Sequence, residues 1–187
     1  RNSLVFPSKS LRGRIIPYEI YPLSFKEFLK FKNTRIENTI AGIGKIEREL
    51  HEYLKYGGFP ECVLLENDTE KINLINSYFR DIIGLDVAEI SGESISTVEL
   101  FGKYTLEALY FSASKCLNFF KSLGYKIAKQ TLLNLEKFSS ESYLFFFFPI
   151  FSRNIRDISQ YTRKAYLWDN SFLYAISGKE DMGRLFE

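Results

Sequence analysis

The segment Tyr143 to Ile150, YLFFFFPI, is the longest apolar run in the chain and the strongest constraint on its fold. It is far shorter than the roughly 20 apolar residues that a membrane-spanning helix needs. Its aromatic side chains are typical of a buried strand, so we expect a strand over Tyr143 to Phe151. A polar loop, Arg153 to Arg163, separates it from a second expected strand, Ala165 to Trp168. These segments predict a hydrophobic hairpin that packs against helices.

Three short helices are expected before this hairpin. Ser96 with Glu99 forms a capping-box pattern that opens a helix ending near Tyr110. A second helix is expected over residues 114 to 123, where Gly124 ends it, and a third over residues 128 to 138. Three helices followed by a two-stranded hairpin is the order of a winged helix-turn-helix.

The N-terminal half is predicted to be mainly helical. Residues 13 to 21 alternate like a strand, and Ser24 with Glu27 then predicts a capped helix. After a polar loop over residues 33 to 42, a second helix begins at residue 43. It should end at Gly57-Gly58, with Pro60 preventing its continuation. Residues 69 to 87 form another amphipathic pattern, and the Ser/Gly-rich stretch 91 to 96 is the expected domain boundary.

Composition favours a soluble cytoplasmic protein and excludes several kinds of site. Of 187 residues, 45% are hydrophobic and 26% charged, as in ordinary globular domains. His51 is the sole histidine, and Cys62 and Cys116 lack metal-ligand spacing. We therefore expect no metal site, no disulfide framework, no membrane partner and a reducing cytoplasm.

Basic residues concentrate in the C-terminal third. From Lys121 to Lys164 the chain has eight basic and three acidic residues, a local net charge of +5, against +2 for the whole chain. This pattern fits an anionic partner. It fits an ordinary solvated face equally well, and composition does not separate the two.

Several segments together resemble the archaeal AAA+ type ATPase family. They are LRGR at 11 to 14, PLSFKEFLKF at 22 to 31, YLKYGGFPE at 53 to 61, SYFRDIIGLDV at 77 to 87, and SLGYKIAKQTLLN with KAYLWDNSFLYAIS further on. The resemblance implies a mainly α fold with a small β component, in which a lid-like helical segment precedes a winged helix-turn-helix. The implied domains are residues 1–90 (the end of the ATPase core and lid), 96–178 (winged helix) and 179–187 (the start of a nuclease-like domain).

The chain has no GxxxxGK[ST] motif, so no phosphate-binding loop can hold a nucleotide. ATP and Mg²⁺ are thus implied only for full-length members of the resembled family, and no cofactor is expected here. Whether the chain belongs to an enzyme stays open, and alone it is predicted to be inactive. The resemblance makes Arg14 a candidate arginine finger that would act on a separate core or a neighbour. The alternative is that Arg12 and Arg14 are surface residues flanking a strand.

A DNA-binding surface is the main functional hypothesis. If residues 128 to 138 are the recognition helix, side chains near its start can bond phosphates and base edges, and basic residues around the hairpin loop can approach the backbone. The candidates are Lys129, Gln130, Thr131, Asn134, Arg153, Arg156, Arg163 and Lys164. The alternative is a packing or protein-interaction module without nucleic-acid binding, whose partner would be an ATPase core or a second copy.

Overall fold

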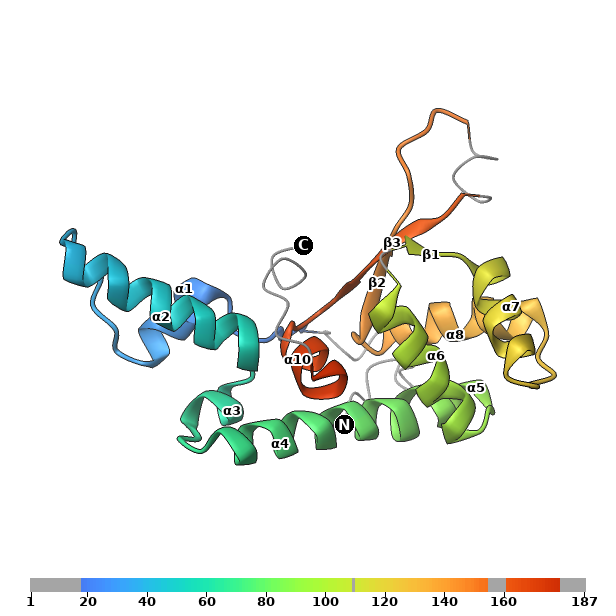
Figure 1. Ribbon diagram of the computed structural model, residues 1–187, viewed down its shortest axis with the longest axis horizontal. Helices are drawn as coiled ribbons and strands as arrows, with labels where there is room; N and C mark the ends of the chain where they lie inside the picture. The colour runs from blue at the N-terminus through green and yellow to red at the C-terminus, as the bar shows by residue number, and fades with distance from the viewer. Residues whose placement is uncertain (1–17, 109, 155–160, 179–187) are drawn as a thin grey trace. The chain divides into compact units, whose positions relative to one another are not determined.

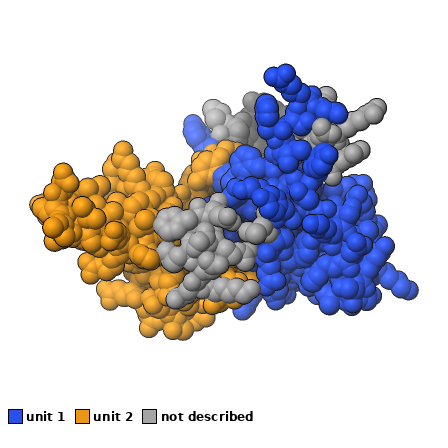
Figure 2. All heavy atoms as spheres, turned by 45° about the horizontal axis from the view of Figure 1, so that its top comes forward, with its two compact units in different colours: residues 1–18, 80–168 blue, residues 19–79, 169–187 orange. Residues whose placement is uncertain are grey.

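A computed structural model describes residues 18–108, 110–154 and 161–178 (Figure 1). These residues are mainly helical with one three-stranded antiparallel sheet, so the expected fold class is confirmed. The chain divides into two compact units, coloured separately in Figure 2. Of the described residues, unit 1 comprises residues 18, 80–108, 110–154 and 161–168, and unit 2 comprises residues 19–79 and 169–178.

Unit 2 is built from helices. They are α1 (Phe25–Phe31), α2 (Ile40–Tyr56), α3 (Pro60–Leu64), most of α4 (Asp68–Asp81) and α10 (Ser171–Ser177). The capping box predicted for α1 is confirmed: Ser24 Oγ accepts from the Glu27 backbone N–H, and the Glu27 carboxylate accepts from the Ser24 backbone N–H at 2.9 Å. Helix α2 begins earlier than expected because Thr39 caps it, accepting from the Gly42 N–H at 3.0 Å.

The expected strand over residues 13 to 21 is not formed where the structure describes it. Residues 18 to 21 have no strand pairing, and residues 13 to 17 lie outside the described part of the chain. Tyr18, Ile20 and Tyr21 are exposed in this stretch, so its alternating pattern does not correspond to a half-buried strand.

Helix α2 ends at Gly57, as predicted, but the reason extends beyond local sequence. Gly57 has a φ of +77°, and a Cβ built there would lie 1.8 Å from Asp169 Oδ1. The Asp169 carboxylate accepts from the backbone N–H groups of Gly58 at 2.8 Å and Ser171 at 2.9 Å. The Gly58 carbonyl in turn accepts from the Leu23 N–H at 2.7 Å. This turn therefore joins three distant segments of unit 2. Pro60 then opens α3 as its first residue.

Unit 1 has the element order of a winged helix-turn-helix. A π-helical segment (Ile82–Ala88) and α5 (Glu89–Ser91) continue directly from α4. They lead to α6 (Ile95–Glu107), β1 (Tyr110–Phe111), α7 (Ala113–Ser122), α8 (Lys129–Glu141), β2 (Phe145–Phe148) and β3 (Arg163–Leu167). The sheet order is β1-β3-β2, with Phe146 opposite Tyr166 and Phe148 opposite Lys164. The hairpin is thus present, with both strands bounded differently from the sequence expectation.

Two boundaries in unit 1 differ from the sequence expectation. Ser94, rather than Ser96, caps α6 by accepting from the Thr97 N–H at 3.2 Å. The two compact units change over between Phe79 and Arg80 and between Trp168 and Asp169, whereas the expected domain boundary lay within residues 91 to 96. The contacts also group α10 with the N-terminal helices, although the expected winged-helix domain ran to residue 178.

Aromatic side chains dominate the core of unit 1. Phe101, Phe111, Phe120 and Phe145 are each at most 1% exposed. Phe111 contacts Phe101 and Phe147 at ring-centroid distances of 5.6 and 5.0 Å. Leu132 and Leu135 of α8 are fully buried, so the amphipathic pattern of that helix fixes which of its faces meets solvent.

Candidate nucleic-acid interface

Helix α8 presents a polar face to solvent. Lys129, Gln130, Asn134 and Lys137 are exposed, and Thr131 is half-buried. Gln130 Nε2 donates to Asn134 Oδ1 at 3.2 Å, so two of the candidate contact residues hold each other in place. Ala128 at the N-cap supplies no side-chain acceptor, which leaves the first backbone N–H groups available to an anion.

The helices around the turn that precedes α8 add positive charge. Between Ala113 and Glu141 the chain has five lysines and two glutamates, and every one of the lysines is exposed: Lys115, Lys121, Lys126, Lys129 and Lys137. The two acidic groups are paired. Glu136 forms an ion pair with Arg163, and Glu141 lies 3.8 Å from Lys137 Nζ. The exposed charge on this surface is therefore predominantly positive.

Arg163 occupies a different place from the one expected for a wing residue. Its guanidinium pairs with the Glu136 carboxylate of α8, and their side chains are 25% and 11% exposed. Burial raises the pKa of Glu136, and the positive charge of Arg163 partly offsets that rise. The pair joins β3 to α8, so Arg163 contributes to packing. Sequence reasoning missed Glu136 because only the hairpin brings these residues together.

Two of the other candidates are exposed in or beside the hairpin. Arg153 is exposed in the loop after β2, and Lys164 is exposed on β3 with its Nζ 5.8 Å from the centre of the Tyr110 ring. Arg156 and Arg14, the candidate arginine finger, lie outside the described residues, as does the expected domain start at 179–187.

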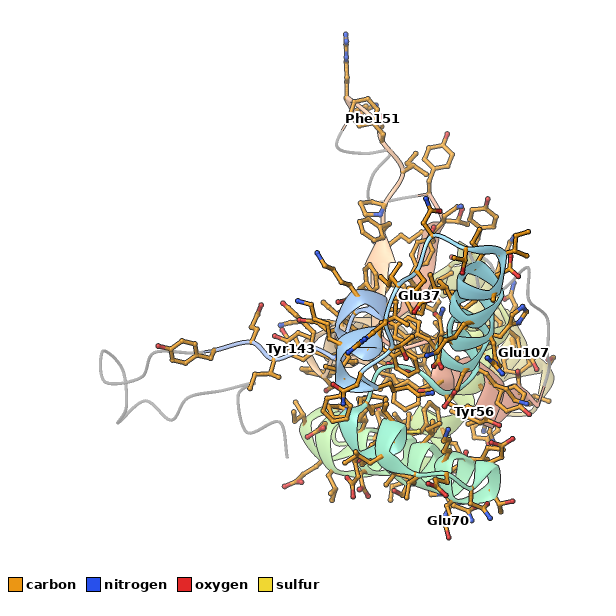
Figure 3. The ribbon with its side chains drawn as sticks, turned by 90° about the vertical axis from the view of Figure 1, so that its left-hand side faces the viewer. Glu37, Tyr56, Glu70, Glu107, Tyr143 and Phe151 are labelled. Atoms are coloured by element: carbon orange, nitrogen blue, oxygen red, sulfur yellow. The ribbon has the colours of Figure 1, made fainter. Side chains whose placement is uncertain are left out.

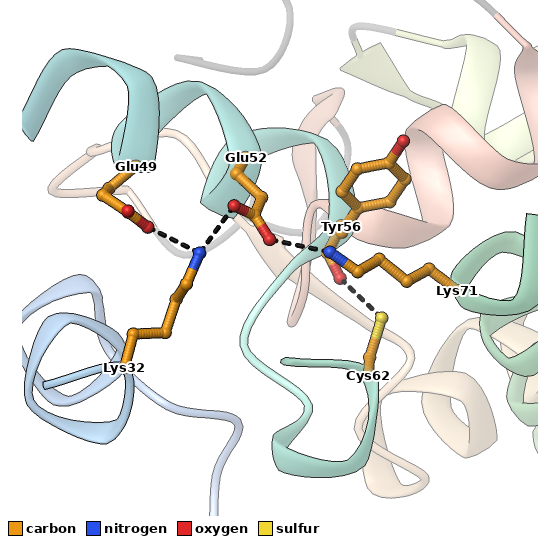
Figure 4. A network of polar contacts seen from close by, with 6 residues as sticks. All are labelled: Lys32, Glu49, Glu52, Tyr56, Cys62 and Lys71. Carbon is orange, nitrogen blue, oxygen red and sulfur yellow. Dashed lines mark hydrogen bonds and ion pairs between the residues drawn. The ribbon is translucent and has the colours of Figure 1, made fainter. Parts of the chain in front are cut away.

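Unit 2 contains a charged cluster that the sequence did not reveal (Figure 4). Lys32 Nζ lies 2.7 Å from Glu49 and 2.6 Å from Glu52, and Lys71 Nζ lies 2.7 Å from the other Glu52 oxygen. Burial raises the pKa of Glu52, but the two lysines outweigh burial and the net shift is downward. Two lysines and two glutamates cancel in charge. The cluster thus connects α1, α2 and α4 and offers no excess charge for a ligand.

The two cysteines are buried and free. Burial raises the pKa of Cys62 to about 11 and that of Cys116 to about 12, so both thiols are protonated at neutral pH and are poor nucleophiles. Among the described residues, no group of three or more His, Cys, Asp or Glu side chains could hold a metal ion. Within the same residues, no helix is long and apolar enough to cross a membrane.

Comparison with known proteins places the chain in a family. The model of the family described as "Domain of unknown function (DUF8612)" matches residues 47–183. The chain belongs to this family. The match includes Glu49, Glu52 and Lys71 of the charged cluster, the Gly57-Gly58 turn, the α8 face and α10.

Two relatives extend well beyond this chain. Uncharacterized protein MJ1544 of Methanocaldococcus jannaschii is 33% identical over 183 residues, which cover 95% of this chain and 41% of that protein. An uncharacterized protein of Haemophilus influenzae is 35% identical over 82 residues, or 44% of this chain and 19% of that protein. The chain therefore spans less than half of the length of these relatives. No solved structure matches it significantly.

Proposed function

We propose that unit 1 binds duplex DNA through the exposed face of α8 and the turn before it, chiefly by contacts to phosphates and with little sequence preference. The observation that supports this most is the group of exposed lysines around α7 and α8, whose two nearby glutamates are already paired. Lysine is a point charge, and its contacts to phosphates position a protein on the backbone without carrying sequence information.

The start of α8 favours the same ligand. Lys129 is its first residue, and the N-terminal N–H groups of a helix attract anions. Gln130 and Asn134 are exposed beside Lys129 and have the chemistry to contact base edges, but their mutual hydrogen bond uses part of that capacity. Backbone contacts should therefore supply most of the affinity.

We further propose that this module is cytoplasmic and regulates an AAA+ type ATPase whose ATP and Mg²⁺ chemistry lies outside this chain. The support is the resemblance of residues 22–31, 53–61 and 77–87 to that family. In this chain those residues form α1, the end of α2 with its glycine turn, and the end of α4 with the π-helical segment. The alternative is a packing module without DNA binding, which the exposed Phe151 favours.

Fluorescence anisotropy with a labelled duplex of about 30 base pairs tests the proposal. Lys126→Glu with Lys129→Glu should weaken binding at least about tenfold in about 50 mM salt and flatten the dependence of affinity on salt. Glutamate near a helix start is favourable, so the fold should survive the change at Lys129. The control is the same charge reversal at Lys26 and Lys45, exposed residues of unit 2, which should leave binding unchanged.

Reversing Arg163 is not a suitable probe, because that change would break its pair with Glu136. If the parent chain fails to bind duplex DNA in about 50 mM salt, where phosphate contacts are strongest, the packing-module alternative is supported. Equal binding by the parent and the Lys126/Lys129 variant would exclude α8 as the contact surface.

A further inference from the structure

The two faces of the unit 1 sheet have different surroundings. Directly opposite residues in an antiparallel sheet share a face, and successive residues alternate between faces. Phe145 and Phe147 therefore share one face with Arg163, which reaches Glu136 of α8, and Phe147 contacts the buried Phe111. This is the inner face, toward the helices. Phe146 and Phe148 point to the opposite, outer face.

The outer face carries a continuous row of aromatic rings. Phe146 lies 5.7 Å from Tyr166, 5.1 Å from Trp168 and 5.0 Å from Phe148, measured between ring centroids. Phe148 contacts Tyr166 at 5.7 Å, and Tyr143 extends the row beyond Trp168 at 5.0 Å. We call Tyr143, Phe146, Phe148, Tyr166 and Trp168 the aromatic row. In a sheet with one face on the core, the residues of the other face are normally polar, so packing of the unit 1 core does not explain this row.

Solvent reaches the row most at its Phe148 end and along the loop that follows it, while Tyr143, Phe146, Tyr166 and Trp168 are half-buried. Phe148 is 54% exposed, and Tyr110, on the neighbouring strand, is 52% exposed. Phe151 is 97% exposed and lies on the loop that projects from the sheet (Figure 3). Basic residues adjoin these rings: Lys164 is directly opposite both Phe148 and Tyr110, and Arg153 follows Phe151 by two residues.

We propose that the outer face of this sheet binds single-stranded DNA by stacking unpaired bases on the aromatic row, with Lys164 and Arg153 near the phosphates. Aromatic rings on a positively charged groove or sheet are the usual platform for unpaired bases, because every base has a π face to stack. The adjoining Lys164 and Arg153 complement the phosphates of a nucleic-acid strand, which a purely apolar partner would not supply. The composition of the face thus favours nucleobases.

This site is separate from the duplex-binding surface. Glu136 of α8 meets the inner face of the sheet, whereas the aromatic row lies on the outer face. A single strand and a duplex would therefore use different residues of unit 1, and each proposal can fail without the other.

The parent chain supplies its own probe, because Trp168 is the only tryptophan and belongs to the row. Titration with a 20-nucleotide thymidine strand should quench its emission and give saturable binding. A strand of equal length and charge with abasic sites in place of the bases should bind at least about fivefold more weakly and leave the emission nearly unchanged, since stacking of even one base accounts for that ratio. Equal binding of both strands would overturn the proposal.

Conservative variants then locate the site. Phe148→Leu with Tyr166→Leu keeps apolar bulk but removes two stacking faces. It should weaken binding of the thymidine strand at least about fivefold and leave duplex affinity unchanged. Phe31→Leu, at a 43% exposed phenylalanine of unit 2, is the matched control and should change neither.

The outcomes separate the two proposals. Loss of duplex binding in the Lys126/Lys129 variant with strand binding retained supports the separate site. Unchanged strand binding in the correctly folded Phe148/Tyr166 variant overturns it, as does a parent chain that binds duplex but no single strand. Binding of the strand without binding of duplex would overturn the α8 proposal and leave the aromatic row supported.

Discussion

The backbone of Gly57 and Gly58 packs directly against the side chain of Asp169, although Gly58 and Asp169 are 111 positions apart in the sequence. Burial raises the pKa of the Asp169 carboxyl, and the N–H groups of Gly58 and Ser171 partly offset that rise. The carboxylate occupies the space where any side chain at position 57 would begin. The sequence predicted the end of α2 from the paired glycines. It could not predict Asp169, because no local pattern links the two positions.

Replacing Gly57 with alanine should destabilise unit 2 by about 2 kcal/mol or more. The new Cβ would meet Asp169 Oδ1, and a φ of +77° is itself unfavourable for alanine. Gly44→Ala is the matched control: nothing lies within 4 Å of a Cβ there, and the site is inside α2, so we expect stabilisation of about 0.5–1 kcal/mol. Urea unfolding followed by circular dichroism measures both. Equal stability of the two variants would show that the turn tolerates a side chain.

At the scale of the element, local signals predicted helices better than strands. The capping box of α1 and the apolar face of α8 depend on residues close in sequence, and both were found where expected within a few residues. The two-residue strand β1 was missed because so short a segment has no periodicity. The cap of α6 was assigned to Ser96 because Glu99 completes a capping box there, whereas Ser94 supplies it.

For the candidate site too, the sequence predicted the part on a helix better than the part on strands. The polar face of α8 followed from helical periodicity, so Lys129, Gln130 and Asn134 are exposed as a contact surface requires. Arg163 was expected beside the hairpin loop as a DNA contact, but its side chain turns toward Glu136. Which face of the sheet Arg163 takes depends on the register between β2 and β3, and local sequence does not determine that register. The aromatic row was hidden for the same reason, since four consecutive phenylalanines do not say which two face the helices.

The ion pair between β3 and α8 should make stability depend on pH when it is broken. Arg163→Met leaves Glu136 buried without its cation, so the pKa of Glu136 should rise further above its ordinary value. A carboxyl with a raised folded-state pKa destabilises the fold most when it is ionised. The variant should therefore lose about 2 kcal/mol near pH 7, and the loss should shrink as the pH falls toward about 5.

Urea unfolding at both pH values measures this difference. Lys164→Met is the control, because it removes one positive charge from the adjacent, exposed residue of the same strand. Its effect on the free energy of unfolding should be small and nearly independent of pH. A loss for Arg163→Met that stays constant between the two pH values would mean that Glu136 is not the group left uncompensated.

At the scale of the whole molecule, unit 2 is assembled from both ends of the described chain. Phe172 of α10 is 1% exposed and contacts Phe59 and Phe79 at 5.6 and 5.9 Å, and Tyr174 contacts Tyr56 at 5.9 Å. With Asp169 at the glycine turn, these contacts explain why α10 groups with the N-terminal helices. A sequence interpretation that follows chain order assigns α10 to the winged helix, because only tertiary contacts separate it from β3.

A chain shortened to end at Trp168 should consequently lose the structure of unit 2 and keep that of unit 1. It lacks Asp169, which accepts hydrogen bonds at the glycine turn, and the buried Phe172 and Leu173, whose burial contributes about 1.5–3 kcal/mol each. The loss of these contributions together should exceed the stability of a unit whose free energy of unfolding is about 5 kcal/mol. Hydrogen exchange should show fast exchange throughout α2 and continued protection in α6 and α8. A chain ending at Gly178 retains α10 and should protect all three helices. If α2 is equally protected in both chains, α10 is an appendage, and the N-terminal helices fold without it.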